Sequence, residues 1–195
     1  MPPASDEFLI ARAASGDLAA FESIVCKYQS PLLHFISKRF PSRSDAQDIL
    51  QDAFLKAWQS LHLYSSSYPF RTWLYTIAYR TAVSHGRKDD PAKPLPPFDL
   101  PDRNLSPLSS VEQEEASSHL WDTARKILSD EQFTALWLHY VEDIPANEIA
   151  KILNRSWVSV KTLMHRARKK LAPVLSPPSP AAQPMCLRTS QDGDL

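Results

Sequence analysis

Residues 144–170 read IPANEIAKILNRSWVSVKTLMHRARKK, and this stretch decides the fold. Residues 148–153 predict a short helix whose three bulky aliphatic side chains share one face. Asn154 follows where the chain must turn, and asparagine tolerates a left-handed backbone better than most residues. Ser156 is positioned to cap the next helix. Two helices joined in this way are typical of a helix-turn-helix.

The second helix of this motif has an apolar side and a cationic side. Its apolar stripe consists of Val160, Met164, Ala167 and Leu171. Residues 155–170 include six basic residues and no acidic ones. We expect the opposite arc to face DNA, because exposed cations bind phosphates and the edges of guanine bases. The residues of that arc are Val158, Lys161, Thr162, His165, Arg166, Arg168 and Lys169.

The two parts of this helix are expected to contact different parts of the DNA. In helix-turn-helix proteins the N-terminal part of the second helix enters the major groove. We therefore expect base-edge contacts from the members of the arc between Val158 and His165. The members between Arg166 and Lys169 are expected to hold phosphates, which fix the register of the protein on DNA.

The N-terminal part of the chain predicts a second helical block. Apolar residues at helical spacing begin after a cap at Asp17. Pro31 fits the start of a further helix, and Ser44 or Asp45 fits the cap of the one after it. A last helix begins near Phe70 and ends before the next glycine. No segment alternates convincingly like a strand, so we expect an all-α fold.

Composition divides the chain into segments. The chain has 17 prolines and only 3 glycines, and many of the prolines fall in two stretches that cannot propagate a helix. Hydrophobic residues make up 43% of the sequence, enough for a packed core, but only over part of the length if the chain is divided. We expect two small helical domains, a proline-rich acidic linker and a disordered tail. Their respective bounds are 6–88 and 111–175 for the domains, 89–110 for the linker and 176–195 for the tail.

The remaining composition excludes several classes of protein. Cys26 and Cys186 form no CxxC pair, so no disulfide framework or zinc site is expected. The sequence has no HExxH, P-loop or glycine-rich fingerprint and no evident pairing of nucleophile and base, so an enzyme is not expected. No apolar run approaches the length of a membrane span. We expect a cytoplasmic protein without cofactor, metal or membrane insertion.

Two helix faces of the N-terminal block have residues that are suited to binding a partner. Asp45, Asp48 and Asp52 recur at steps of three and four, so their carboxylates share a helix face that suits cations of a partner. Gln51 lies beside them. A later helix mixes aromatic and basic residues, a combination suited to unstacked bases and a charged backbone. Its core side is expected to consist of Phe70, Leu74, Ile77, Ala78 and Thr81. Its outward, DNA-facing residues are expected to be Arg71, Thr72, Tyr75, Thr76, Tyr79 and Arg80.

These motifs resemble the bacterial RNA polymerase sigma factors of the small, extracytoplasmic-function (ECF) class. Residues 128–168 are similar to region 4, which reads the −35 promoter element. Asn154 replaces the usual glycine of the turn, and Leu163 stands where the family generally has arginine. Residues 45–54 are similar to the acidic helix that docks on the clamp of the largest polymerase subunit, with Gln47 in place of a usual glutamate. The helix from residue 69 matches region 2.3–2.4, which with the preceding loop captures a melted −10 base.

The resemblance implies an alternative sigma factor that binds the clamp and flap of core RNA polymerase and directs promoter-specific initiation. It assigns polymerase binding to Asp45, Asp48, Gln51 and Asp52. It further implies promoter DNA as a partner, and an anti-sigma factor as a candidate partner that no residue identifies. In the family the linker threads toward the active-site cleft, although a simple solvated linker is the alternative. The alternative function is a helix-turn-helix regulator that binds duplex DNA without polymerase, against which the acidic and the aromatic-basic helices argue.

Overall fold

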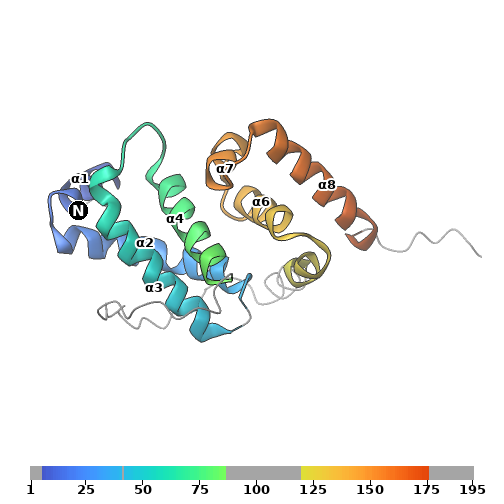
Figure 1. Ribbon diagram of the computed structural model, residues 1–195, viewed down its shortest axis with the longest axis horizontal. Coiled ribbons are helices and arrows are strands. Elements are labelled where there is room, and N and C mark those ends of the chain that lie inside the picture. Colours follow the sequence, from blue (N-terminus) through green and yellow to red (C-terminus); the bar gives the residue numbers. More distant parts are fainter. Residues whose placement is uncertain (1–5, 41, 87–119, 176–195) are drawn as a thin grey trace, which may run out of the picture.

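The computed structural model describes residues 6–40, 42–86 and 120–175, and every regular element in them is helical (Figure 1). The expected all-α fold is confirmed. The expected linker, 89–110, and tail, 176–195, lie outside the described residues. The N-terminal half consists of α1 (Asp6–Ala14), α2 (Leu18–Ser37), α3 (Arg43–Ser60), the 3₁₀ turn η1 (Leu61–Leu63) and α4 (Phe70–His85). The C-terminal half consists of helical residues 120–127, α6 (Asp130–Tyr140), α7 (Ala146–Ile152) and α8 (Trp157–Leu175).

Side-chain caps fix where the helices begin. Asp17 caps α2 as expected, because its carboxylate accepts a hydrogen bond from the backbone N–H of Ala20 at 3.1 Å. The cap of α3 is Ser42, and the expectation of a cap at Ser44 or Asp45 is wrong. The backbone N–H of Asp45 itself donates to the Ser42 hydroxyl at 3.3 Å, so Asp45 already lies in the first turn.

Two features of the N-terminal half differ from the sequence-based expectation. Pro31 lies inside α2, which runs unbroken over 20 residues, so the expectation of a separate helix is wrong. Proline removes one backbone hydrogen bond, but Leu32 and Phe35 after it are fully buried and hold both parts of α2 on one core. Helix α1 was not anticipated; it packs against α2, where Tyr28 donates to the Asp6 carboxylate at 2.8 Å.

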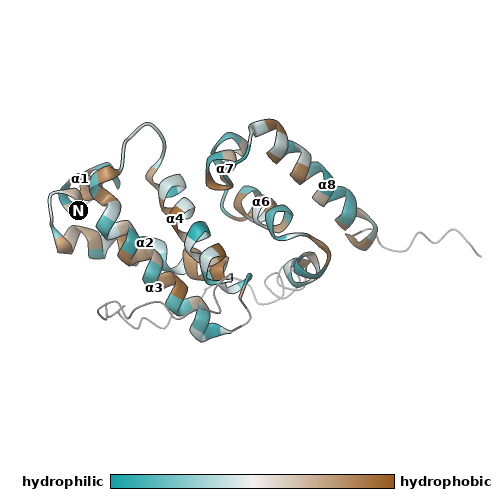
Figure 2. Ribbon diagram, in the orientation of Figure 1, coloured by the Kyte–Doolittle hydropathy of each residue, from teal (hydrophilic) through white to brown (hydrophobic). Residues whose placement is uncertain are grey.

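Each half has an aromatic-rich interior. In the N-terminal half α2, α3 and α4 pack on one another, and Phe21, Phe35 and Phe54 are almost completely buried. Burial of one such side chain contributes about 1.5–3 kcal/mol. In the C-terminal half the Trp137 ring lies 4.9 Å from that of Trp121, centroid to centroid. Figure 2 shows hydrophilic and hydrophobic residues interleaved along α8, as expected of a helix that buries one side.

The two halves are in contact. Helix α4 of the N-terminal half packs against α7 of the C-terminal half (Figure 1). The His34 ring at the end of α2 meets the Trp137 ring of α6 edge to face, at 4.8 Å between centroids. The buried residues of both halves accordingly form one continuous cluster.

Candidate nucleic-acid and polymerase interfaces

The turn between α7 and α8 has the geometry that the sequence predicts. Asn154 has a φ of 51°, in the left-handed region. The next residue closes the turn, because the N–H of Arg155 donates to the carbonyl of Ala150 at 2.9 Å. The hydroxyl of Ser156 accepts from the N–H of Ser159 at 3.2 Å and so caps α8. The expected helix-turn-helix is confirmed.

Helix α8 presents the predicted DNA arc to solvent. Its expected core stripe, Val160 to Leu171, is buried at all four positions. All seven expected DNA-facing residues are exposed, namely Val158, Lys161, Thr162, His165, Arg166, Arg168 and Lys169. Leu163, beside the stripe, is half-buried. An exposed cationic arc backed by a buried apolar stripe can lie in a groove of DNA without unfolding the domain.

Trp157 is a surface feature of α8 that the sequence reasoning missed. Its side chain is 49% exposed at the first position of the helix. The ammonium of Lys161 lies 3.7 Å from the centre of its ring, a cation–π contact that fixes both side chains. The adjacent Val158 is 64% exposed. The available signal was a large aromatic residue directly before a predicted base-contacting residue.

Helix α3 carries the acidic face that was expected to bind polymerase. Asp45 and Asp48 are exposed near its N-terminus, while Gln51 and Asp52 are half-buried. The Asp52 carboxylate lies 2.9 Å from Nε2 of His85, at the end of α4. Two of the three carboxylates are therefore open to solvent, and the third is shared with α4.

On helix α4, the burial of some residues that were expected to face DNA differs from the expectation. Of the residues expected on its core side, Phe70, Leu74, Ala78 and Thr81 are buried and Ile77 is half-buried. Of those expected to face outward, Arg80 is exposed, whereas Arg71, Thr76 and Tyr79 are half-buried. The outward orientation expected for Thr72 and Tyr75 is wrong, because both side chains are fully buried. The Tyr75 ring packs against the Phe35 ring of α2, at 5.6 Å between centroids, and Thr72 contacts the C-terminal half.

Carboxylates of the C-terminal half bind the covered face of α4. The guanidinium of Arg71 donates to Glu142 at 2.7 Å, and the hydroxyl of Thr72 donates to Glu148 in α7. The Glu142 side chain is only 5% exposed. Burial, together with the nearby Glu142 carboxylate, raises the pKa of Tyr75 far above its usual range. The phenol of Tyr75 is therefore neutral at physiological pH.

The segment before α4, at residues 61–68, is the expected location of a base pocket. The Tyr64 hydroxyl donates to the carbonyl of Tyr68 at 3.0 Å, and the Tyr64 ring packs against Phe70 and Trp73. Trp73 is half-buried in this aromatic group. Lys151 of α7 lies over the Tyr68 ring at 4.6 Å.

The fold and these surfaces define a helical protein of two parts with a DNA-binding helix-turn-helix in the second. The family model described as Sigma-70 region 2 matches residues 24–91, and the model described as Sigma-70, region 4 matches residues 123–171. The ECF RNA polymerase sigma-E factor of Haemophilus influenzae is 30% identical over 89% of this chain and 96% of that protein. The RNA polymerase sigma-H factor of Pseudomonas aeruginosa is 31% identical over 88% of this chain and 94% of that protein.

Solved structures agree at the level of the fold. The structure of CnrH in complex with the cytosolic domain of CnrY has a TM-score of 0.65 at 24% identity, over 87% of this chain and 96% of that chain. The sigma factor RpoE of Bartonella quintana, solved in complex with the anti-sigma factor NepR, has a TM-score of 0.59 at 19% identity, over 80% and 96% of the chains.

The chain belongs to the ECF family of RNA polymerase sigma factors. It is an alternative sigma factor, a DNA-binding initiation factor that directs transcription from promoters. Within the described ranges, no helix is both long and apolar enough to cross a membrane.

Proposed function

We propose that this sigma factor binds its partners through three separate surfaces. The acidic face of α3 binds the clamp of core RNA polymerase, α4 and the loop before it hold the melted −10 element, and α8 reads the −35 element. The domains proposed for these roles span 6–88 and 111–175. The observation that carries the proposal is the solvent-exposed, wholly non-acidic arc of α8 above a buried stripe.

Recognition by α8 combines base contacts and phosphate contacts. Val158 and the residues of the arc up to His165 lie on the first half of the helix, which enters the groove in this motif. Lys161 donates to guanine acceptors, and the methyl groups of Val158 and Thr162 contact thymine methyls. Arg166, Arg168 and Lys169 bind phosphates, which supplies salt-dependent affinity.

Docking of α3 follows from charge complementarity. Asp45 and Asp48 are exposed one turn apart, so both carboxylates reach the same basic surface on the polymerase. Gln51 and Asp52 extend that face by a further turn. The family relationship supports the clamp of the largest subunit as the partner and the polymerase flap as a second contact, made by the C-terminal half.

The mechanism on this proposal is positioning and melting, not covalent catalysis, and the protein is not an enzyme. No cofactor takes part. The aromatic and polar residues of α4 hold bases of the melted strand, and extrusion of a base costs a few kcal/mol. Because core polymerase works in the cytoplasm, the protein acts there. An anti-sigma factor is proposed as a regulator, because a sigma factor of the same fold was solved in complex with one.

The test is run-off transcription with core polymerase on a library of genomic DNA fragments. Addition of the protein is expected to produce new, discrete start sites that disappear with the double variant Asp45→Ala, Asp48→Ala. Glu22→Ala is the matched control, since Glu22 is an exposed carboxylate on α2. Absence of new starts, together with specific binding of the protein alone to duplex DNA, would refute the proposal and favour the regulator without polymerase.

A further inference from the structure

An aromatic ring at the start of α8 holds a lysine side chain. Trp157 and Lys161 are four residues apart on the helix, so their side chains share one face. The ammonium nitrogen of Lys161 lies 3.7 Å from the centre of the Trp157 ring. Because helical side chains lean toward the N-terminus of their helix, this contact stretches the lysine back along α8. Its ammonium group therefore lies near the end of the helix that is proposed to enter the major groove.

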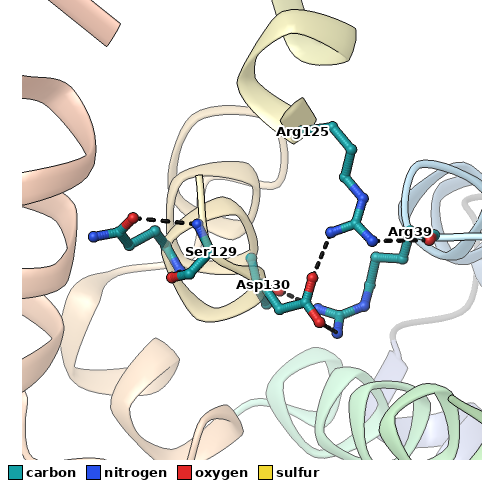
Figure 3. Close-up of polar contacts among 6 residues, drawn as sticks. Arg39, Arg125, Ser129 and Asp130 are labelled. Carbon is teal, nitrogen blue, oxygen red and sulfur yellow. Dashed lines mark hydrogen bonds and ion pairs between the residues drawn. The ribbon is translucent and has the colours of Figure 1, made fainter. Parts of the chain in front are cut away.

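The ring restrains Lys161 without neutralising its charge. Other cations of the C-terminal half are held by carboxylates, since Arg125 donates to Asp130 (Figure 3) and Arg155 lies 2.8 Å from Glu131. Helix α8 contains no acidic residue, and none of the carboxylates that the structure describes forms an ion pair with Lys161. An aromatic ring attracts a cation through its quadrupole and carries no net charge. The charge of Lys161 thus stays available to a ligand.

The position of Trp157 is not explained by the core. The buried side of α8 consists of the stripe from Val160 to Leu171, and Trp157 is not part of it. Its side chain is 49% exposed, and that of the adjacent Val158 is 64% exposed. A large ring, an aliphatic side chain and a held ammonium group are thus neighbours on the surface proposed to face DNA.

We propose that Trp157 is a positioning residue that sets the base preference of Lys161. The inference rests on the proposed reading of the −35 element by α8. Lysine has a long, flexible stem, and immobilising such a side chain on a ligand weakens binding by roughly 2- to 10-fold. The Trp157 ring restricts the side chain before DNA binds, so that less of this affinity is lost.

The ligand of the placed ammonium group is the major-groove edge of a guanine. Guanine offers two acceptors there, O6 and N7, whereas adenine and thymine offer one each and cytosine none. A restrained ammonium group gains most from the base with two acceptors. The ring is therefore expected to raise the preference for guanine at one base pair and to leave binding to other sequences nearly unchanged.

The contact predicts a signature in the free protein. The methylene group next to the ammonium group of Lys161 lies against the Trp157 ring, so its protons are expected to be shifted upfield in NMR spectra of the full-length chain. The shift is expected to disappear in Trp157→Leu, which keeps an apolar side chain but has no ring. Unshifted protons in the unmodified protein would show that the ring does not hold the lysine, and would overturn the proposal.

Base preference is measured with reconstituted holoenzyme on a promoter found by run-off transcription. Each base pair of the −35 element is changed in turn, and the relative affinities are obtained by competition. Lys161→Met is expected to abolish the preference for guanine at one position. Trp157→Ala is expected to lower the same preference by roughly 2- to 10-fold, and Trp157→Phe, which keeps a ring, is expected to retain most of it. Tyr140→Ala, at an exposed aromatic residue that ends α6, is the matched control with no expected change.

A double variant separates positioning from other roles of the ring. If Trp157 acts through Lys161, Trp157→Ala has no further effect on base preference in the Lys161→Met background. An effect that persists in that background, or that weakens binding to all sequences equally, overturns the proposal, because the ring then serves folding or contacts a partner directly. Relaxed preference in Lys161→Met but not in Trp157→Ala overturns the positioning role while the proposed function stands. Unchanged preference in Lys161→Met refutes the proposed reading of bases by this lysine, and the positioning role with it.

Discussion

The salt dependence of promoter binding tests the roles assigned to the arc of α8. Three cations in its second half, Arg166, Arg168 and Lys169, are exposed and proposed to bind phosphates. Each phosphate contact contributes a slope of about −0.9 to the logarithm of the binding constant against the logarithm of salt concentration. A rise in salt from 50 to 200 mM is therefore expected to weaken these three contacts about 40-fold together, and a single remaining contact only about 3- to 4-fold.

The perturbation is Arg166→Gln with Lys169→Gln, which leaves one of the three cations. Binding of the reconstituted holoenzyme to a promoter found by run-off transcription is measured over that salt range. The slope is expected to fall in magnitude by about 1.8 relative to the unmodified protein. Contacts made by the polymerase and by α4 are common to both proteins and cancel in the difference.

Lys126→Gln is the matched control, since Lys126 is an exposed cation of the same half that lies outside α8. Its slope is expected to equal that of the unmodified protein. A double variant with an unchanged slope would show that these side chains do not bind phosphates, and the orientation proposed for α8 on DNA would then be wrong.

Three further predictions concern stability and pH. Asn154→Val should destabilise the protein by about 1–3 kcal/mol in urea unfolding, because a branched side chain is strained at positive φ; Asn154→Gly should cost less, and equal losses would contradict this reading. Ser129→Ala should lower stability by about 1 kcal/mol in thermal unfolding, since Ser129 forms a capping box with Gln132; an unchanged midpoint would argue against the cap. The hydrogen bond from Arg125 lowers the pKa of Asp130, so its contribution to stability is present above the ordinary pKa of aspartate and is lost as pH falls through the lowered value. Acid unfolding of Asp130→Asn should lack this component, and identical acid profiles would refute the assignment.

Short-range patterns in the sequence were sufficient to predict the helix-turn-helix. The left-handed turn at Asn154, the cap at Ser156 and the buried stripe of α8 depend on residues a few positions apart, so periodicity and backbone preference predict them. The same local reasoning failed at Pro31. A proline normally favours a helix start, but burial of the residues on both sides kept α2 continuous.

The sequence by itself determined that the protein is all-helical, that its second part contains a DNA-binding motif, and which arc of α8 is cationic. Only the tertiary structure decided the environment of α4. Thr72 and Tyr75 are polar and lie off the apolar stripe, so any helical wheel places them in solvent. Thr72 is buried against Glu148 of α7, some seventy residues further along the chain, and Tyr75 is buried against Phe35 of α2, forty residues before it. Periodicity reports which side of a helix can be buried by its own neighbours, whereas a contact between distant segments exists only after the chain has folded.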